Sequence, residues 1–529
     1  MRRLSPVILS FSYACFCAGL AQAQFGRGAG WTTAGGDAQR SFWVKTDAKI
    51  SRESLQKPGF QLLWKVKLNN QPTQLNSLTT AVTLEGYIGY RGFRTLAHLG
   101  GSSNHVFAVD IDLGRLEWEK ALPSGSMGQG NSPMCPGGMT SEVTRPTPTA
   151  IITAGPPRGG GRGGPARSGV GEPGEGAVTI AAAAARAGAN APPRMPPDAR
   201  GRGPGGRGAP NAVYAIASDG KLHSMFVSNG DDTEPPLDFI PAGANAHGLI
   251  VVDNAAYVAT TDGCGGAANA LWAIDLVSKQ VSSWKPESGG IAGSLGPAFD
   301  TDGSLYIATT DGELSHLEAK TLKPLGSYSA KPGFASTPVV FAYKFKTLMA
   351  VAGKDGSIHL LDTGALGGAD HHTPLAKSPA LPNAADFAPG ALASWQDNDG
   401  TRWILASAGN AVSAWNVVDD GGSPKLQSGW TSREMVSPLT PMVVNGVVFA
   451  LSSGEFRSND SKVSVAERIK RSSPAVLYAL DPATGKEYWN SGKSITSFVH
   501  GGTLSGGGTQ VYLETYDGNL YAFGFYIEH

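Results

Sequence analysis

Cysteine, charged residues and long apolar segments are all scarce in this chain. Its 529 residues include only four cysteines, none of them in a Cys-x-x-Cys or Cys-x-x-Cys-His pattern. The missing spacing excludes a zinc ribbon and a covalently attached haem. Charged residues make up only 16% of the chain and the 41% hydrophobic fraction shows no long helical periodicity, whereas glycine is abundant at 71 residues. This combination favours many short strands joined by tight turns, so we expect an all-β protein.

No apolar run reaches the ~20 residues that a membrane-spanning helix needs. The run at residues 7–20 follows Arg2 and Arg3 and precedes Ala21-Gln22-Ala23. A basic start, a short apolar stretch and small residues at the end are the three parts of a secretory signal peptide. We therefore predict a signal peptide at 1–23, cleavage after Ala23, and a periplasmic or secreted protein that does not span the membrane.

After this cleavage only Cys135 and Cys264 remain. In an oxidising compartment two leftover thiols tend to pair, so a disulfide between them is one hypothesis. The alternative is that both are unpaired, small apolar residues.

Three similar phrases recur along the chain, each a strand that ends in Ala-x-Asp or a variant of it, a tight turn, and a strand that closes on Trp. They are VFAVDIDLGRLEW (106–118), LWAIDLVSKQVSSW (271–284) and LYALDPATGKEYW (477–489). Because a single core rarely grows past ~250 to 300 residues, a chain of this length with internal repeats indicates a fold that enlarges by repetition.

The repeats divide the chain into eight units of four strands each, which begin near residues 78, 147, 247, 296, 336, 388, 440 and 500. Unit one has a predicted long loop from Phe93 to Asn104 between its second and third strands, and the first strand of unit two is placed at 147–153. The last unit ends one strand short, and FQLLWKVKL (60–68) supplies a strand that belongs to no other unit. We therefore predict an eight-bladed β-propeller over residues 60–529, closed by this N-terminal strand, with 24–59 as a lead-in segment.

The Ala-x-Asp-x-x-Thr-Gly-x-x-x-Trp phrase resembles the tryptophan-docking motif of the pyrroloquinoline-quinone (PQQ) type propeller family. The copy at 479–489 matches it fully; Leu113 replaces the usual Thr in another, Ser278-Lys279 replaces Thr-Gly, and units four to six lack the closing Trp. The resemblance extends from about Trp31 to the C-terminus. It implies that the closing tryptophans dock between neighbouring blades and are structural, namely Trp64, Trp118, Trp284 and Trp489.

The same resemblance implies two kinds of function, because quinoprotein dehydrogenases hold PQQ and Ca²⁺ at the channel mouth whereas scaffold members only bind proteins. Such an oxidising site needs metal-binding Glu and Asn residues, a Trp under the cofactor and an Asp base. Here the Glu position falls at Ala267 or Ala268, the stretch 289–313 has neither Trp nor Asn, 331–340 has no carboxylate, and the adjacent-cysteine pair is absent. We therefore expect a noncatalytic binding or scaffold protein; the alternative is a periplasmic PQQ-dependent oxidoreductase that acts on alcohols or polymers.

Four polar residues precede the first strands of units two, three, six and eight, at one mouth of the predicted channel. Side chains that converge on a mouth suggest a small-ligand site, and the alternative is that they are ordinary solvated rim residues. They lack the fixed spacing of a metal site, so no metal is predicted. These cofactor-site candidates are Arg145, His247, Asp386 and His500.

The same face receives Cys135, Cys264, the loop from Phe93 to Asn104 and an insertion at 454–474 with a short helix expected at Val463 to Lys470. Because loops on a rigid scaffold carry much of protein binding, we expect an envelope protein or polymer to bind this face of a monomer.

A second insertion, residues 155–210, is rich in Gly, Pro and Arg, with eight arginines, no lysine and three acidic residues. Such a composition buries too little surface to offset its ordering entropy, so we expect disorder. No aromatic residues interleave the arginines, which argues against specific nucleic-acid binding and favours a solvated loop that contacts anionic envelope polymers.

Overall fold

The computed structural model describes residues 30–89, 92–125, 132–150, 211–381, 387–460 and 462–526. The predicted signal peptide and the insertion at 155–210 lie outside these residues, so both stay predictions. Within the described ranges, no helix is long and apolar enough to cross a membrane.

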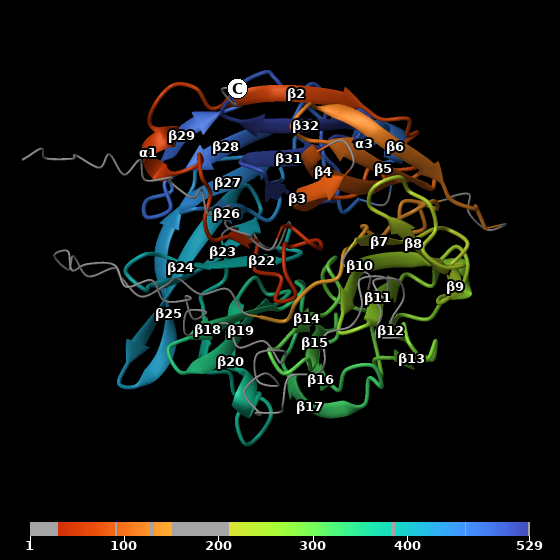
Figure 1. Ribbon diagram of the computed structural model, residues 1–529. Coiled ribbons are helices and arrows are strands. Elements are labelled where there is room, and N and C mark those ends of the chain that lie inside the picture. Colours follow the sequence, from red (N-terminus) through yellow and green to blue (C-terminus); the bar gives the residue numbers. More distant parts are fainter. Residues whose placement is uncertain are drawn as a thin grey trace, which may run out of the picture.

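The strands form eight sheets that follow one another around a ring, viewed roughly along its axis in Figure 1. Blades one to four contain β3 (Val82–Gly89), β4 (Gly92–Gly101), β5 (His105–Asp110) and β6 (Arg115–Ala121); β7 (Ala212–Ile216), β8 (Lys221–Phe226) and β9 (Leu237–Asp238); β10 (Asn245–Val252), β11 (Ala255–Thr261), β12 (Ala270–Asp275) and β13 (Val281–Trp284); and β14 (Ala298–Phe299), β15 (Leu305–Ala308), β16 (Glu313–Leu317) and β17 (Pro324–Ser329).

Blades five to eight contain β18 (Val339–Tyr343), β19 (Lys346–Ala352), β20 (Ile358–Asp362) and β21 (Ala376–Lys377); β22 (Leu392–Gln396), β23 (Arg402–Ala408), β24 (Ala411–Asp420) and β25 (Ser423–Thr431); β26 (Met442–Val444), β27 (Val447–Ser452), β28 (Val476–Leu480) and β29 (Glu487–Asn490); and β30 (Ser505–Gly507), β31 (Gln510–Glu514), β32 (Asn519–Gly524) and β2 (Gln61–Lys67). Short helical turns are α1 (Arg52–Leu55), η2 (Cys264–Gly266), η3 (Thr363–Ala365) and α3 (Val465–Arg471). The predicted all-β, eight-bladed propeller is confirmed.

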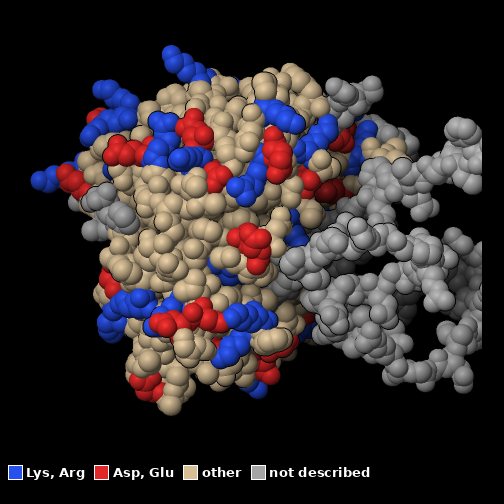
Figure 2. All heavy atoms as spheres, turned by 90° about the vertical axis from the view of Figure 1, so that its left-hand side faces the viewer, with Lys and Arg blue, Asp and Glu red and all other residues tan. Residues whose placement is uncertain are grey.

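The ring is closed by the N-terminal strand β2, which pairs antiparallel with β32 and places Trp64 opposite Ala522. Blade eight therefore takes three strands from the C-terminal end of the chain and one from near the N-terminus (Figure 1). This pairing covers the outer edge of β32, and β2 becomes the outer strand of blade eight. On the outside of the ring seen in Figure 2, Lys and Arg are interspersed with Asp and Glu, without a broad field of one sign.

Docking tryptophans join neighbouring blades. Trp64 donates from Nε1 to the Ile111 carbonyl at 3.0 Å, and Trp118 donates in the same way to the Val227 carbonyl at 2.9 Å. Each ring covers a turn glycine of the next blade, so closely that a β-carbon on Gly114 would lie 2.5 Å from Trp64 and one on Gly230 would lie 2.8 Å from Trp118.

Trp430 makes the same contact, donating to the Pro482 carbonyl at 2.8 Å above Gly485. The prediction that units four to six lack a closing Trp is therefore wrong for unit six. The strands β24 and β25 of this hairpin have ten and nine residues. Trp430 therefore lies farther along the sequence from the turn than the closing Trp of the motif does, and the motif spacing misses it.

Trp284 and Trp489 are half-buried and make no such bond to a turn among the described residues. Trp489 packs edge-on against Phe60, with ring centroids 4.8 Å apart. It cannot meet a turn glycine because the third and fourth strands of blade eight come from opposite ends of the chain.

Two strand assignments differ from the prediction. Residues 92–101 form strand β4 and not a loop. The reason is that β3 has a bulge between Leu84 and Tyr87, where Gly86 has a φ of 62°. After this bulge β3 continues through the residues that were predicted as the second strand. In blade two, Thr144 bridges Tyr214, which moves the inner position ahead of the predicted strand at 147–153, of which 151–153 lie outside the described residues. Pro146 and Pro148 lack the N–H groups that an inner strand would need.

Residues 30–44, which we call the plug, fill the middle of the ring (red in Figure 1). Its last part, β1 (Trp43–Val44), runs parallel to β26. The plug bonds to the inner wall of blades one to seven in turn, through the pairs Trp31–Thr83, Thr32–Arg145, Thr33–Leu249, Ala38–Phe299, Gln39–Val340, Ser41–Ser394 and Phe42–Val443.

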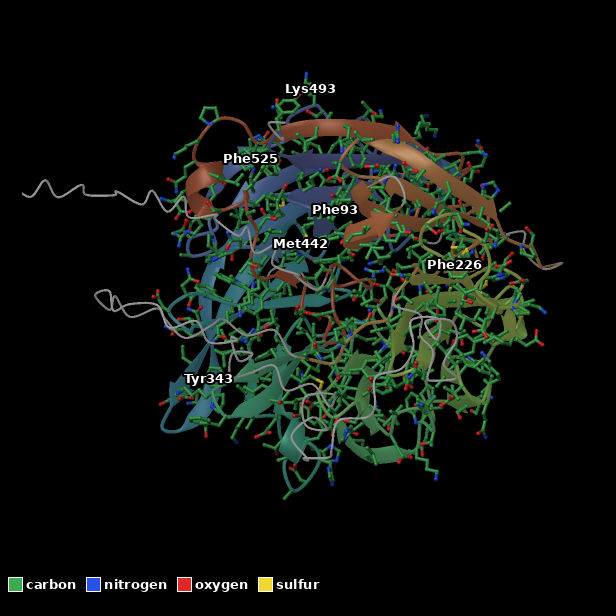
Figure 3. All side chains as sticks on the ribbon, viewed as in Figure 1. Phe93, Phe226, Tyr343, Met442, Lys493 and Phe525 are labelled. Atoms are coloured by element: carbon green, nitrogen blue, oxygen red, sulfur yellow. A yellow bond between two sulfur atoms is a disulfide. The ribbon has the colours of Figure 1, made fainter. Side chains whose placement is uncertain are left out.

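The plug also comes within van der Waals distance of the eighth blade, because a β-carbon on Gly506 of β30 would lie 3.5 Å from Val44 Cγ2. The same β-carbon would lie 3.3 Å from Sδ of Met442 on β26, which is labelled in Figure 3. Sequence analysis had assigned this segment only as part of a lead-in. In the structure it closes the central channel.

Candidate functional site

Two connected hollows lie where the loops before the inner strands of blades four, six, seven and eight meet. The inner one has a volume of about 220 Å³ and the outer one about 510 Å³. Phe387, Gly409 and Arg457 line both, and we call the two together the mouth groove. The other lining residues are Ser294, Ala388, Pro389, Gly390, Ser407, Ala408, Asn410, Ser437, Pro438, Leu439, Thr440, Ser458, Asn459, Gly501, Gly502 and Thr503.

The plug closes the channel beneath the groove. Leu295 and Leu439 belong to the same buried apolar cluster as Trp31 and Phe42 of the plug, whose rings lie 6.1 Å apart. The groove is therefore a depression on the surface and does not continue as an open passage along the propeller axis.

Arg457 is the cationic group of the groove. Its Nε donates to Glu455 Oε2 at 3.1 Å, and its guanidinium lies 5.5 Å from the centre of the Phe387 ring. No acceptor among the described residues takes a hydrogen bond from its two terminal nitrogens. The Nε of this guanidinium is bonded to Glu455 and one of its faces lies on the Phe387 ring. The edge that carries the two terminal nitrogens is therefore free to bind an anion.

Glu455 holds this arrangement from below. Only 1% of its side chain is exposed, and it also accepts from Arg468 Nη2 at 2.6 Å and lies 2.7 Å from His500 Nδ1. Burial raises the pKa of Glu455, but the hydrogen bond and charge of His500, together with those of Arg457, outweigh this and lower it to about 2. One carboxylate thus faces two guanidinium groups, which leaves the cluster with excess positive charge.

Arg468 comes from α3, which begins after Ser464; the Ser464 hydroxyl accepts from the Glu467 amide. The short helix predicted within 454–474 is confirmed, displaced by two residues at its start.

Three of the four predicted mouth residues are described, and these three lie in different surroundings. Arg145 is 9% exposed in the channel wall and donates from Nη1 to the Thr83 carbonyl at 2.9 Å, so it is not a rim residue. His247 lies on β10, where burial lowers its pKa. His500 belongs to the Glu455 cluster, and Asp386 lies outside the described residues.

PQQ with Ca²⁺ does not fit the residues described here. Ala267 and Ala268 have methyl side chains, so neither position offers a carboxylate; Ala267 is buried at the end of η2, and the Ala268 carbonyl accepts from Thr260 Oγ1. Over the described ranges, no group of three or more His, Cys, Asp or Glu side chains is placed to hold a metal. Phe387, the aromatic residue of the groove, already has a guanidinium over its ring.

Cys135 and Cys264 form a disulfide with a Cα–Cα distance of 5.5 Å. Cys135 precedes the inner position of blade two and Cys264 lies in η2 of blade three, so the bond ties neighbouring blades together at the face that carries the groove.

Comparison with known proteins gives likeness in structure only. No protein-family model and no curated sequence matches the chain. The quinohemoprotein alcohol dehydrogenase from Comamonas testosteroni superposes with a TM-score of 0.55 at 12% identity, over 95% of this chain and 81% of that one. The quinohemoprotein alcohol dehydrogenase ADHIIG from Pseudomonas putida HK5 gives 0.55 at 11% identity, over 94% and 80%.

BamB from Moraxella catarrhalis gives 0.47 at 12% identity, over 89% of this chain and 99% of that one, a score too low to support an argument. The chain is thus an eight-bladed propeller with the fold of the quinohemoprotein alcohol dehydrogenases. At these identities the likeness concerns the fold and not the activity.

Sequence reasoning did not find the groove. It noted 454–474 as a loop, but Glu455 and Arg457 carry no motif, and Phe387 follows a different blade. The one signal in the sequence was the place of this insertion on the loop-rich face, where binding of a partner was expected.

Proposed function

We propose that this chain is an exported propeller of the cell envelope that binds a ligand or partner at its loop-rich face and catalyses no reaction. The observation that carries the proposal is the mouth of the ring, where the plug closes the channel and the groove above it presents a free guanidinium edge; among the described residues, no group of three or more His, Cys, Asp or Glu is placed there to hold a metal. Such a surface has the means to bind, and its described lining residues include no Asp, Glu or His that could act as the acid, base or metal ligand of an oxidation.

Two further observations support binding at this face. The plug bonds to the inner strands of blades four, six and seven, which border the groove, so its walls are held in place. The groove lies between loops, and loops on a rigid scaffold are where binding residues concentrate.

A titration with PQQ tests the proposal against the oxidoreductase alternative. Purified protein from residue 24 onward is titrated with PQQ in the presence of Ca²⁺ while the cofactor absorbance is followed, and dye-linked oxidation of an alcohol panel is then measured. We expect neither stoichiometric binding nor turnover.

A quinohemoprotein alcohol dehydrogenase freed of PQQ serves as the positive control, which shows that reconstitution works under the same conditions. Stoichiometric binding followed by alcohol turnover would replace the binding-protein proposal by the oxidoreductase.

A further inference from the structure

We propose that the mouth groove is a binding site for a small, hydroxyl-rich carboxylate, of which a uronic acid sugar is the simplest example. This inference rests on the proposed function and names its ligand class. The carboxylate pairs with the free edge of Arg457, and the sugar hydroxyls contact the hydroxyl and amide groups around it.

The anion end of the site is built and not incidental. The Arg457 guanidinium is fixed by the buried Glu455 at 3.1 Å and by the Phe387 ring at 5.5 Å, and Arg457 lines both hollows. Because Glu455 also binds Arg468, one of the two positive charges is left for a ligand. The planar fork of a guanidinium matches a carboxylate with two parallel hydrogen bonds.

The rest of the groove is polar without being charged. In the part of the chain that the structure describes, the hydroxyls of Ser294 and Ser407 and the side-chain amide of Asn459 have no hydrogen-bond partner. Asn459 is exposed at the outer end, beside Ser458. Uncommitted hydroxyl and amide groups suit a ligand that carries several hydroxyls of its own.

The size of the groove agrees with this class. Its hollows of about 220 and 510 Å³ are of the order of small-molecule sites, and the plug beneath prevents a longer ligand from entering the channel end-on. A polymer would therefore lie across the face with one acidic unit in the groove.

Isothermal titration calorimetry with D-galacturonate tests the inference. We expect one site per chain, no binding of neutral D-galactose, and affinity for galacturonate reduced about tenfold to a hundredfold in Arg457→Gln, as expected for the loss of hydrogen bonds to a charged group. Arg457→Lys should lie between the two, since it keeps the charge but not the fork.

Arg433→Gln is the matched control, because Arg433 also pairs with a glutamate and lies over an aromatic ring, Tyr478, yet does not line the groove. It should bind galacturonate unchanged. Asn459→Asp places a negative charge at the exposed end of the groove and should lower the affinity for galacturonate. Because this substitution disturbs no buried contact, its result stays interpretable even if Arg457→Gln alters the Glu455 cluster.

Inorganic phosphate is titrated separately. Equal binding of galactose, tighter binding of phosphate than of galacturonate, or galacturonate affinity unchanged in both Arg457→Gln and Asn459→Asp would each overturn the inference. Absence of galacturonate binding would also overturn it, while leaving the proposed function to the PQQ titration.

Discussion

At the scale of single residues, the least expected group is Arg402 on β23. It is 1% exposed, and its Nε and Nη2 have no hydrogen-bond partner among the residues that the structure describes. Its guanidinium lies 5.6 Å from the ring centre of Trp43 and 5.4 Å from that of Phe341. Burial lowers its pKa to about 9. Cation–π contacts offset only part of the cost of burying this charge.

Arg402→Met should therefore raise the free energy of unfolding, by about 1 to 3 kcal/mol, because an apolar side chain of similar length removes the desolvation cost. Urea denaturation at pH 7 measures this, with Arg402→Lys as the control that keeps a charge. A clear loss of stability in the Met variant would mean that the guanidinium is paired in solution.

Glu514, on β31, is 6% exposed and accepts one hydrogen bond, from the Ala81 amide at 3.0 Å. Burial raises its pKa to about 8. The folded state thus holds this proton more tightly than the unfolded state, so the contribution of Glu514 to stability is fully present below about pH 4.5 and is lost as the pH rises through about 8.

Glu514→Gln should match the wild type near pH 4 and become the more stable protein by roughly 4 kcal/mol at pH 9. Denaturation curves for both proteins between pH 4 and pH 9 give the difference in their free energies of unfolding. The contributions of the other titrating groups are the same in both proteins and cancel in this difference. A difference that does not change with pH would show that the pKa of Glu514 is the same in the folded and the unfolded protein.

At the scale of elements, the docking tryptophans divide into two kinds. Trp430 is 8% exposed and bonds to the turn of the next blade, whereas Trp284 is half-buried and makes no such bond among the described residues. Trp430→Ala should cost about 3 to 5 kcal/mol of unfolding free energy, and Trp284→Ala clearly less. Thermal or urea denaturation of both variants measures this, and equal losses would contradict the docking role.

The sequence predicted these elements where repetition made them visible. Alternating strands, Asp-Gly turns and the spare strand at 60–68 were enough for eight blades and their closure. The prediction from sequence failed where local geometry changed the number of residues in a strand or turn. The bulge at Gly86 lengthened β3, and two prolines, Pro146 and Pro148, moved the inner position of blade two. Long strands displaced Trp430.

At the scale of the whole molecule, the plug could not be predicted because it belongs to no repeat. Its bonds reach inner strands from Thr83 to Val443, so every contact is distant in sequence and none leaves a periodic pattern. The groove was missed for the same reason, since Phe387, Arg457 and Thr503 meet only after the ring closes.

The account depends on the channel being closed by the plug in solution, and hydrogen–deuterium exchange of residues 30–44 measures this most directly. The amides of Gly36, Arg40 and Phe42 are bonded within the plug, and that of Trp31 to Thr83 Oγ1. We predict that they exchange as slowly as the inner strands β10 and β18, which open only with the whole fold. Exchange of these amides within seconds would show an open channel and would contradict the account.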